Sequence, residues 1–133
     1  MFKHKINVGM STIYEKIITP ADSYLSNSVS IDSLMSTPAL LATIIEISWN
    51  MFKPLIPEGY LTVVRSFQYE HLYPSLVGEK VKFKLKVEAV ENNRIHVAFT
   101  GTDHIGEFCS GKFEKVIVRN DKLLEEAYKR VKM

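Results

Sequence analysis

The stretch Ser36–Trp49 reads STPALLATIIEISW and is almost wholly apolar apart from one carboxylate, Glu46. Pro38 fits the first turn of a helix, and the hydroxyl of Thr37 can cap that turn by accepting from its free amides. A proline disfavours helix in the residue before it, so we expect one long helix that ends just before Pro54. Apolar residues cover nearly its whole circumference, which predicts a helix buried on most sides.

Glu46 is the unusual residue of this helix, because a buried carboxylate is unfavourable unless it is paired, hydrogen-bonded or neutralised. We interpret it as a working group; the alternative is a carboxylate that pairs with a lysine or reaches a dimer interface. Thr43 shares its face, and can bond either Glu46 or a backbone carbonyl. Thr37 lies on the opposite face, about 13 Å away along the axis, so no direct pair with Glu46 is expected in one chain.

The composition is that of an ordinary globular protein. A chain of 133 residues suffices for one domain with a core, and we expect a single domain over residues 1–133. The net charge of +2 is spread along the chain, which predicts no nucleic-acid partner. The only cysteine, Cys109, rules out a disulfide framework within one chain. With no leader pattern and no apolar run long enough for a bilayer, we expect a cytoplasmic protein without a membrane partner.

Outside the helix, apolar residues alternate with a period of two, which is typical of strands. An antiparallel sheet needs its apolar face covered, and only the long helix can cover it. We therefore predict an α+β protein whose antiparallel sheet wraps around one long central helix, with a short C-terminal helix. The other expected elements are a strand over Ile6–Ile18, a loop over Thr19–Ser36, strands over Leu61–Leu72, Glu79–Glu91, Arg94–Asp103 and Glu107–Arg119, and a helix over Asp121–Met133.

Four short motifs carry a resemblance to a known family. They are TPALLATIIE at Thr37–Glu46, Glu58-Gly59, the strand end YEHL at Tyr69–Leu72 with Pro74 and Gly78 after it, and GKFEKVIV at residues 111–118. With these motifs the chain resembles hot-dog acyl-CoA thioesterases, and most of all their fluoroacetyl-CoA thioesterase-like branch, over roughly residues 5–120. The resemblance implies the hot-dog fold and hydrolysis of an acyl-CoA thioester.

The resemblance also implies which residues carry the chemistry. Thr37 would be the nucleophile or a hydrogen-bonding aligner, Glu46 would activate water or attack the carbonyl, and His71 would relay protons. No metal and no resident cofactor are implied, since coenzyme A enters as part of the substrate. From the residues alone, Thr37 can equally be a plain helix cap, and His71 a surface imidazole at a strand end.

Further residues would contact the substrate. These are Thr43, Val64, Arg65, Phe67 and Lys115, of which Arg65 and Lys115 would meet coenzyme A phosphates and Phe67 would line an acyl or pantetheine tunnel. The chain departs from the branch at three points: Val64 replaces a glycine, Lys115 replaces an arginine, and Thr37 precedes Glu46 by nine residues instead of eight. The resemblance therefore implies a general acyl-CoA thioesterase and does not carry over the fluorinated substrate.

Hot-dog sites of this family lie between subunits, so we expect a homodimer, with a tetramer left open. In a dimer, Thr37 or Glu46 of one chain could meet His71 of the other. Two alternatives remain: a non-catalytic module that binds acyl ligands, and an acyl-CoA dehydratase or hydratase on the same fold.

Overall fold

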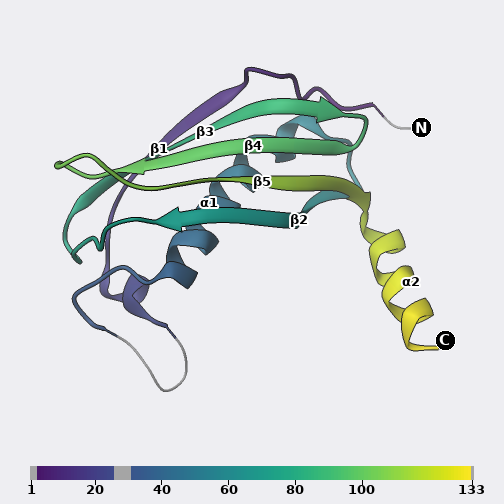
Figure 1. Ribbon diagram of the computed structural model, residues 1–133. Coiled ribbons are helices and arrows are strands. Elements are labelled where there is room, and N and C mark those ends of the chain that lie inside the picture. Colours follow the sequence, from purple (N-terminus) through teal and green to yellow (C-terminus); the bar gives the residue numbers. More distant parts are fainter. Residues whose placement is uncertain (1–2, 26–30, 133) are drawn as a thin grey trace.

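Five antiparallel strands form one sheet in the order β1-β3-β4-β5-β2, and one long helix lies beneath one face of this sheet (Figure 1). The structure is a computed structural model that describes residues 3–25 and 31–132. The elements are β1 (Ser11–Ile17), α1 (Thr37–Phe52), β2 (Tyr60–His71), β3 (Lys80–Glu91), β4 (Arg94–Thr102), β5 (Glu107–Arg119) and α2 (Asn120–Val131), with short 3₁₀ turns at Pro20–Ser23 and Lys53–Leu55. The predicted architecture is therefore confirmed.

The core lies between α1 and the sheet. In β3 the apolar residues from Val81 to Val87 are buried and the lysines between them are exposed, because successive side chains of a strand point to opposite faces. From α1, Leu40, Ile44 and Phe52 meet this apolar face and are fully enclosed. Burial of these large side chains is the main stabilising term of the fold.

The start of the first strand and the cap of the central helix differ from the prediction, whereas the other helix and strand ends agree within two residues. The first strand begins at Ser11 instead of Ile6, because Gly9 adopts a φ of +94° in a turn that interrupts the extended chain. The residue that caps α1 is Ser36, so the prediction of Thr37 as the cap is wrong. The loop before α1 is confirmed outside residues 26–30, which lie outside the described part of the chain, as does Met133.

One face of α1 stays open in the single chain. Ala42, Glu46 and Asn50 follow one another at a spacing of four residues, and all three are exposed. The expected burial of the helix on most sides is therefore only partly right, and the expected burial of Glu46 is wrong for this chain. The carboxylate is tolerated on the helix because water reaches it.

Strand β2 is an edge of the sheet. It pairs with β5 from Tyr60–Arg119 to His71–Cys109, and within the described chain no strand pairs with its other side. The two backbones approach closely at Gly111, where a Cβ would clash with the carbonyl oxygen of Gln68. A register shift between Val64 and Ser66 marks a bulge in this edge strand.

Candidate active site

The hydroxyl groups of Ser36 and Thr37, at the start of α1, make different contacts. Ser36 precedes the helix with extended backbone, and its Oγ accepts from the backbone N–H of Ala39 at 3.1 Å. The same hydroxyl donates to the carbonyl of Tyr24 at 2.7 Å, which fixes the preceding loop to the helix start. Because Ser36 satisfies the capping position, the side chain of Thr37 is available for another contact.

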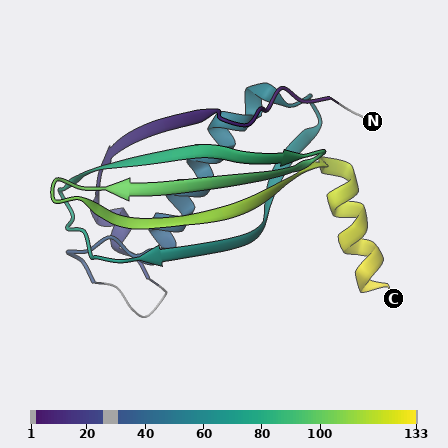
Figure 2. The same ribbon diagram turned by 45° about the horizontal axis from the view of Figure 1, so that its top comes forward.

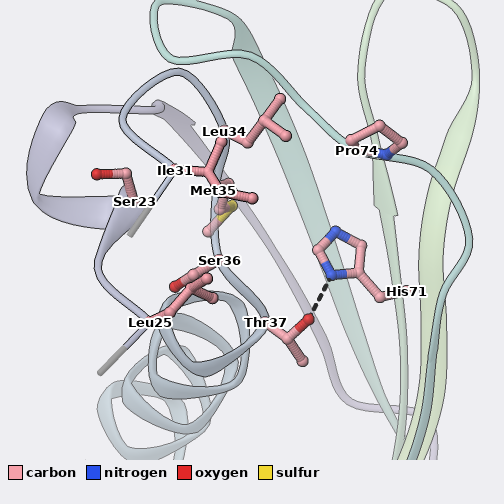
Figure 3. A pocket seen from close by; sticks show the side chains of 9 residues that line it. All are labelled: Ser23, Leu25, Ile31, Leu34, Met35, Ser36, Thr37, His71 and Pro74. Atoms are coloured by element: carbon pink, nitrogen blue, oxygen red, sulfur yellow. Dashed lines mark hydrogen bonds between the residues drawn. The ribbon is translucent and has the colours of Figure 1, made fainter. Parts of the chain in front are cut away.

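The hydroxyl of Thr37 contacts the imidazole of His71. The distance from Oγ1 to Nδ1 is 2.8 Å, and His71 reaches this point as the last residue of β2 (Figure 3). The pair thus joins the start of the central helix to the end of an edge strand. Both residues belong to the same chain, whereas the sequence-based expectation placed such a meeting between Thr37 of one subunit and His71 of the other.

Burial sets the charge state of His71. Loss of hydration disfavours the imidazolium, so the pKa of His71 is lowered from its ordinary value of 6.5. The ring is therefore neutral at pH 7, and its Nδ1 can accept a proton when Nε2 carries the ring hydrogen. Nε2 is enclosed and has no hydrogen-bond partner among the described residues. A neutral imidazole bonded to a hydroxyl is the arrangement that activates an alcohol nucleophile.

A cavity of about 300 Å³ opens beside this pair (Figure 3). Its wall combines apolar side chains from the loop before α1 with a few polar groups at one end, as is usual for small-molecule sites. The lining residues are Ser23, Leu25, Ile31, Leu34, Met35, Ser36, Thr37, His71 and Pro74.

The helix N-terminus is less rich in free amides than its sequence suggests. Pro38 has no N–H group, and the N–H of Ala39 is taken by the cap. Neither effect removes the N–H of Thr37, which stays next to the hydroxyl that contacts His71. The positive end of the helix dipole adds to this amide, so an anion is stabilised at this point.

Glu46 lies in a different place from the Thr37–His71 pair. It lines a separate groove of about 80 Å³ between α1 and β1, together with Tyr14, Lys16, Thr43, Ile47 and Asn50. Thr43 does not donate a hydrogen bond to it there, since its hydroxyl donates to the carbonyl of Ala39 at 2.8 Å. The described chain therefore does not bring Glu46 and His71 together, and the catalytic role of Glu46 stays a prediction.

The expected contact between Lys115 and coenzyme A phosphates is wrong. The side chain is 1% exposed, and its Nζ donates to the Oγ of Ser48 on α1 at 3.0 Å. Burial lowers the pKa of Lys115 from 10.5 to about 8. An ammonium group enclosed between helix and sheet cannot reach a phosphate in the solvent.

The other expected substrate contacts lie along β2, outside the cavity. Phe67 stacks on Phe113 with 4.9 Å between the ring centres, which is packing within the sheet. Val64 is half-buried beside the bulge, and Arg65 is the exposed residue of the bulge itself. Their roles in substrate binding stay predictions, because none of the three lines the cavity.

Several residues of the cavity were not expected from the sequence. Ser36 caps the helix in place of Thr37, and Met35 and Leu34 supply apolar wall. The adjacent Ser-Thr pair before Pro38 was an available signal, because serine and threonine both favour the N-cap position and a helix has only one such position. The other hydroxyl is then free for a different contact. No signal in the loop itself indicated that Ser23 would return to the helix start.

Among residues 3–25 and 31–132, no group of three or more His, Cys, Asp or Glu side chains could hold a metal ion. Within the same residues, no helix has the length and apolar character needed to cross a membrane. Cys109 is buried as expected for a structural thiol, and burial raises its pKa to about 12.

Comparisons with known proteins bear on the family and the fold of this chain. A family model described as fluoroacetyl-CoA-specific thioesterase matches residues 18–121. A hot-dog-like protein from Thermanaerovibrio acidaminovorans is 27% identical, with a TM-score of 0.82 over 92% of this chain and 91% of that one. A thioesterase superfamily member from Thermus thermophilus is 21% identical, with a TM-score of 0.81 over 96% and 94%.

The fluoroacetyl-CoA thioesterase FlK is 14% identical, with a TM-score of 0.85 over 94% of this chain and 97% of that one. A variant of FlK has been solved in complex with fluoroacetate and CoA. None of the curated proteins matches the chain in sequence. The structural likenesses confirm the hot-dog fold.

Proposed function

The chain belongs to the family of fluoroacetyl-CoA-specific thioesterases, and we propose on this premise that it hydrolyses acyl-CoA thioesters in the cavity where Thr37 meets His71. The fold and the family make the protein a thioesterase. The observation that carries the assignment to this cavity is the 2.8 Å contact between Thr37 Oγ1 and His71 Nδ1.

The pair supports a nucleophilic mechanism. Neutral His71 takes the hydroxyl proton of Thr37 at Nδ1 while Thr37 Oγ1 forms a bond to the thioester carbonyl carbon. The C–S bond then breaks, and the coenzyme A thiolate leaves with the proton held by His71. Water attacks the acyl-threonine ester, again with His71 as the base, and releases the free acid.

The start of α1 stabilises the charge that develops in these steps. The oxyanion forms beside the backbone N–H of Thr37 and the positive end of the helix dipole. The apolar side of the cavity, formed by Leu34, Met35 and their neighbours, suits an apolar acyl group. The coenzyme A part of the substrate remains outside, because about 300 Å³ is too small for it.

The proposal includes a homodimer in which two β2 strands pair and the site lies at the junction of the two subunits. Two features support it: the unpaired side of β2 and the open face of α1. The proposal also keeps the cytoplasmic location expected from the sequence, which the unpaired thiol of Cys109 supports.

The test measures thiol release from a panel of acyl-CoAs by the wild-type protein and its variants. Thr37→Ala and His71→Ala should each lower kcat by about 10²–10⁴-fold. His104→Ala is the matched control, since His104 is an exposed turn residue that pairs with Glu79 at 2.8 Å. A Thr37→Ala protein that keeps its activity would remove Thr37 from the mechanism.

The pH profile gives an independent check on His71. Because its pKa is lowered from 6.5, activity should fall on the acid side with a midpoint below pH 6.5. An exposed imidazole would instead give a midpoint near 6.5. Mass spectrometry of the acylated protein separates Thr37 as nucleophile from Thr37 as aligner of a water molecule.

The Glu46→Gln variant tests whether Glu46, the third predicted catalytic residue, takes part in the reaction. A loss as large as that of His71→Ala would bring this carboxylate into the reaction, and little change would leave it outside. The same panel separates the alternatives: binding without thiol release indicates an acyl-ligand module, and hydration of an enoyl-CoA without thiol release indicates a hydratase.

A further inference from the structure

Helix α2 carries an apolar stripe that no described part of its own chain covers. Leu124, Tyr128 and Val131 follow the spacing of one helix face, and all three are exposed. Charged side chains occupy the opposite face, among them Glu126. No residue of α2 is buried, so its apolar side is unpartnered in the described chain.

The position of α2 links this stripe to the free edge of the sheet. Strand β5 leads into α2 beside the first residues of β2, where the N–H of Asn120 donates to the carbonyl of Gly59 at 3.0 Å. From there α2 runs past the outer side of β2, away from the rest of the sheet (Figure 2). A molecule that docks along β2 therefore lies next to α2.

The other end of β2 carries a second exposed apolar group. Leu72 and Tyr73 follow His71 directly, and Tyr73 is 63% exposed. Pro74, the next residue, lines the cavity of the Thr37–His71 pair. The two apolar surfaces thus lie at opposite ends of the same edge strand.

In a two-fold symmetric dimer, the two apolar surfaces of different subunits lie next to each other. When identical edge strands pair about a two-fold axis they run antiparallel, so the start of one β2 lies beside the end of the other. The start of β2 carries α2, and the end carries Leu72 and Tyr73. We propose that α2 of one subunit packs its Leu124–Val131 stripe on the partner's Tyr73 and the partner's Leu72, beside the mouth of the partner's cavity.

This inference rests on the homodimer of the proposed function and adds a contact that crosses the subunits. Each active site would then be bordered by the C-terminal helix of the other chain. The occupant is a second copy of this chain because the stripe, the free strand edge and the receiving residues form one continuous surface only in that pairing.

Cross-linking tests the contact directly. One chain carries Tyr128→Cys, a differently tagged chain carries Tyr73→Cys, and the mixture is treated with a short bifunctional maleimide. The native Cys109 does not interfere, because it is buried and its thiol pKa is about 12. We expect cross-linked pairs that contain both tags, and far fewer when Glu126→Cys on the opposite face of α2 replaces Tyr128→Cys.

A second measurement uses sedimentation and kinetics. Leu124→Glu should weaken self-association by about tenfold and raise KM for acyl-CoA, whereas Glu126→Gln should change neither. Equal cross-linking from both faces of α2, no cross-linking in a dimeric sample, or a monomeric wild-type protein would each overturn the inference. Its failure is distinct from failure of the proposed function, which is absence of thiol release from every acyl-CoA tested with the wild-type protein.

Discussion

Lys115 places an ammonium group inside the core with a serine as its hydrogen-bond partner. In the sequence it stands in an alternating strand and resembles a surface lysine. The neighbouring Glu114 is also buried, on the opposite face of β5, where it pairs with Arg94. Alternation fails as a guide here because both faces of this strand segment are covered.

Lys115→Met should raise the free energy of unfolding at pH 7. The pKa of Lys115 is about 8 in the folded protein against 10.5 when unfolded, so the unfolded chain binds more protons between these values. Stability therefore rises from pH 8 to pH 10.5, and below pH 8 the full penalty applies, on the order of 3 kcal/mol. Urea unfolding of the wild-type protein and of Lys115→Met measures the two free energies of unfolding.

The gain from Lys115→Met should shrink as the pH approaches 10.5, because the amine of the folded wild-type protein is then neutral and no charge is buried. Lys112→Met is the control, since Lys112 is exposed on the same strand. Equal stability of Lys115→Met and wild type at pH 7 would contradict the buried charge.

The N-terminus of α1 shows how one element prepares a site. A Ser-Thr-Pro sequence offers two hydroxyls, and the loop decides between them by placing the carbonyl of Tyr24 within 2.7 Å of Ser36 Oγ. Thr37 then faces β2 and meets His71. The element predicted from local sequence was right, but the assignment of its cap depended on a residue twelve positions earlier.

Ser36→Ala should lower both stability and activity. It removes the cap on the Ala39 amide and the link to Tyr24, which costs about 0.5–2 kcal/mol of unfolding free energy. It also loosens the turn that holds Thr37, so thiol release should slow more than the stability loss explains. Chemical unfolding and kcat at a temperature where the variant stays folded test this.

Ser33→Ala is the matched control, because Ser33 is an exposed serine of the same loop. Full activity of Ser36→Ala would show that the first turn holds Thr37 without its cap.

At the scale of the whole molecule, the free side of β2 is the edge on which the proposed homodimer depends. The carbonyl of Gln68 points toward β5, so the backbone groups of its neighbour Tyr69 point to the unpaired side. Tyr69→Pro should therefore keep the pairing with β5 but abolish dimerisation, since proline is tolerated only where its missing N–H is not needed.

Sedimentation should show a monomeric Tyr69→Pro protein, while far-UV circular dichroism stays close to that of wild type. Tyr69→Val retains the N–H group and should remain dimeric. A Tyr69→Pro protein that dimerises as well as Tyr69→Val would exclude β2 as the interface.

The sequence by itself determined the elements and their packing: the apolar helix between Ser36 and Pro54, the alternating strands, and a sheet that this helix must cover. These features depend on neighbours within a few residues, so local pattern and the need to bury apolar surface suffice to predict them. The tertiary structure alone decided which hydroxyl caps α1, that Thr37 meets His71 within one chain, that Glu46 lies in another groove, and that Lys115 is enclosed. Such details depend on contacts between residues far apart in the chain. A side chain can lie one helical turn away, or on the other face of a strand, while the local pattern of apolar residues stays the same.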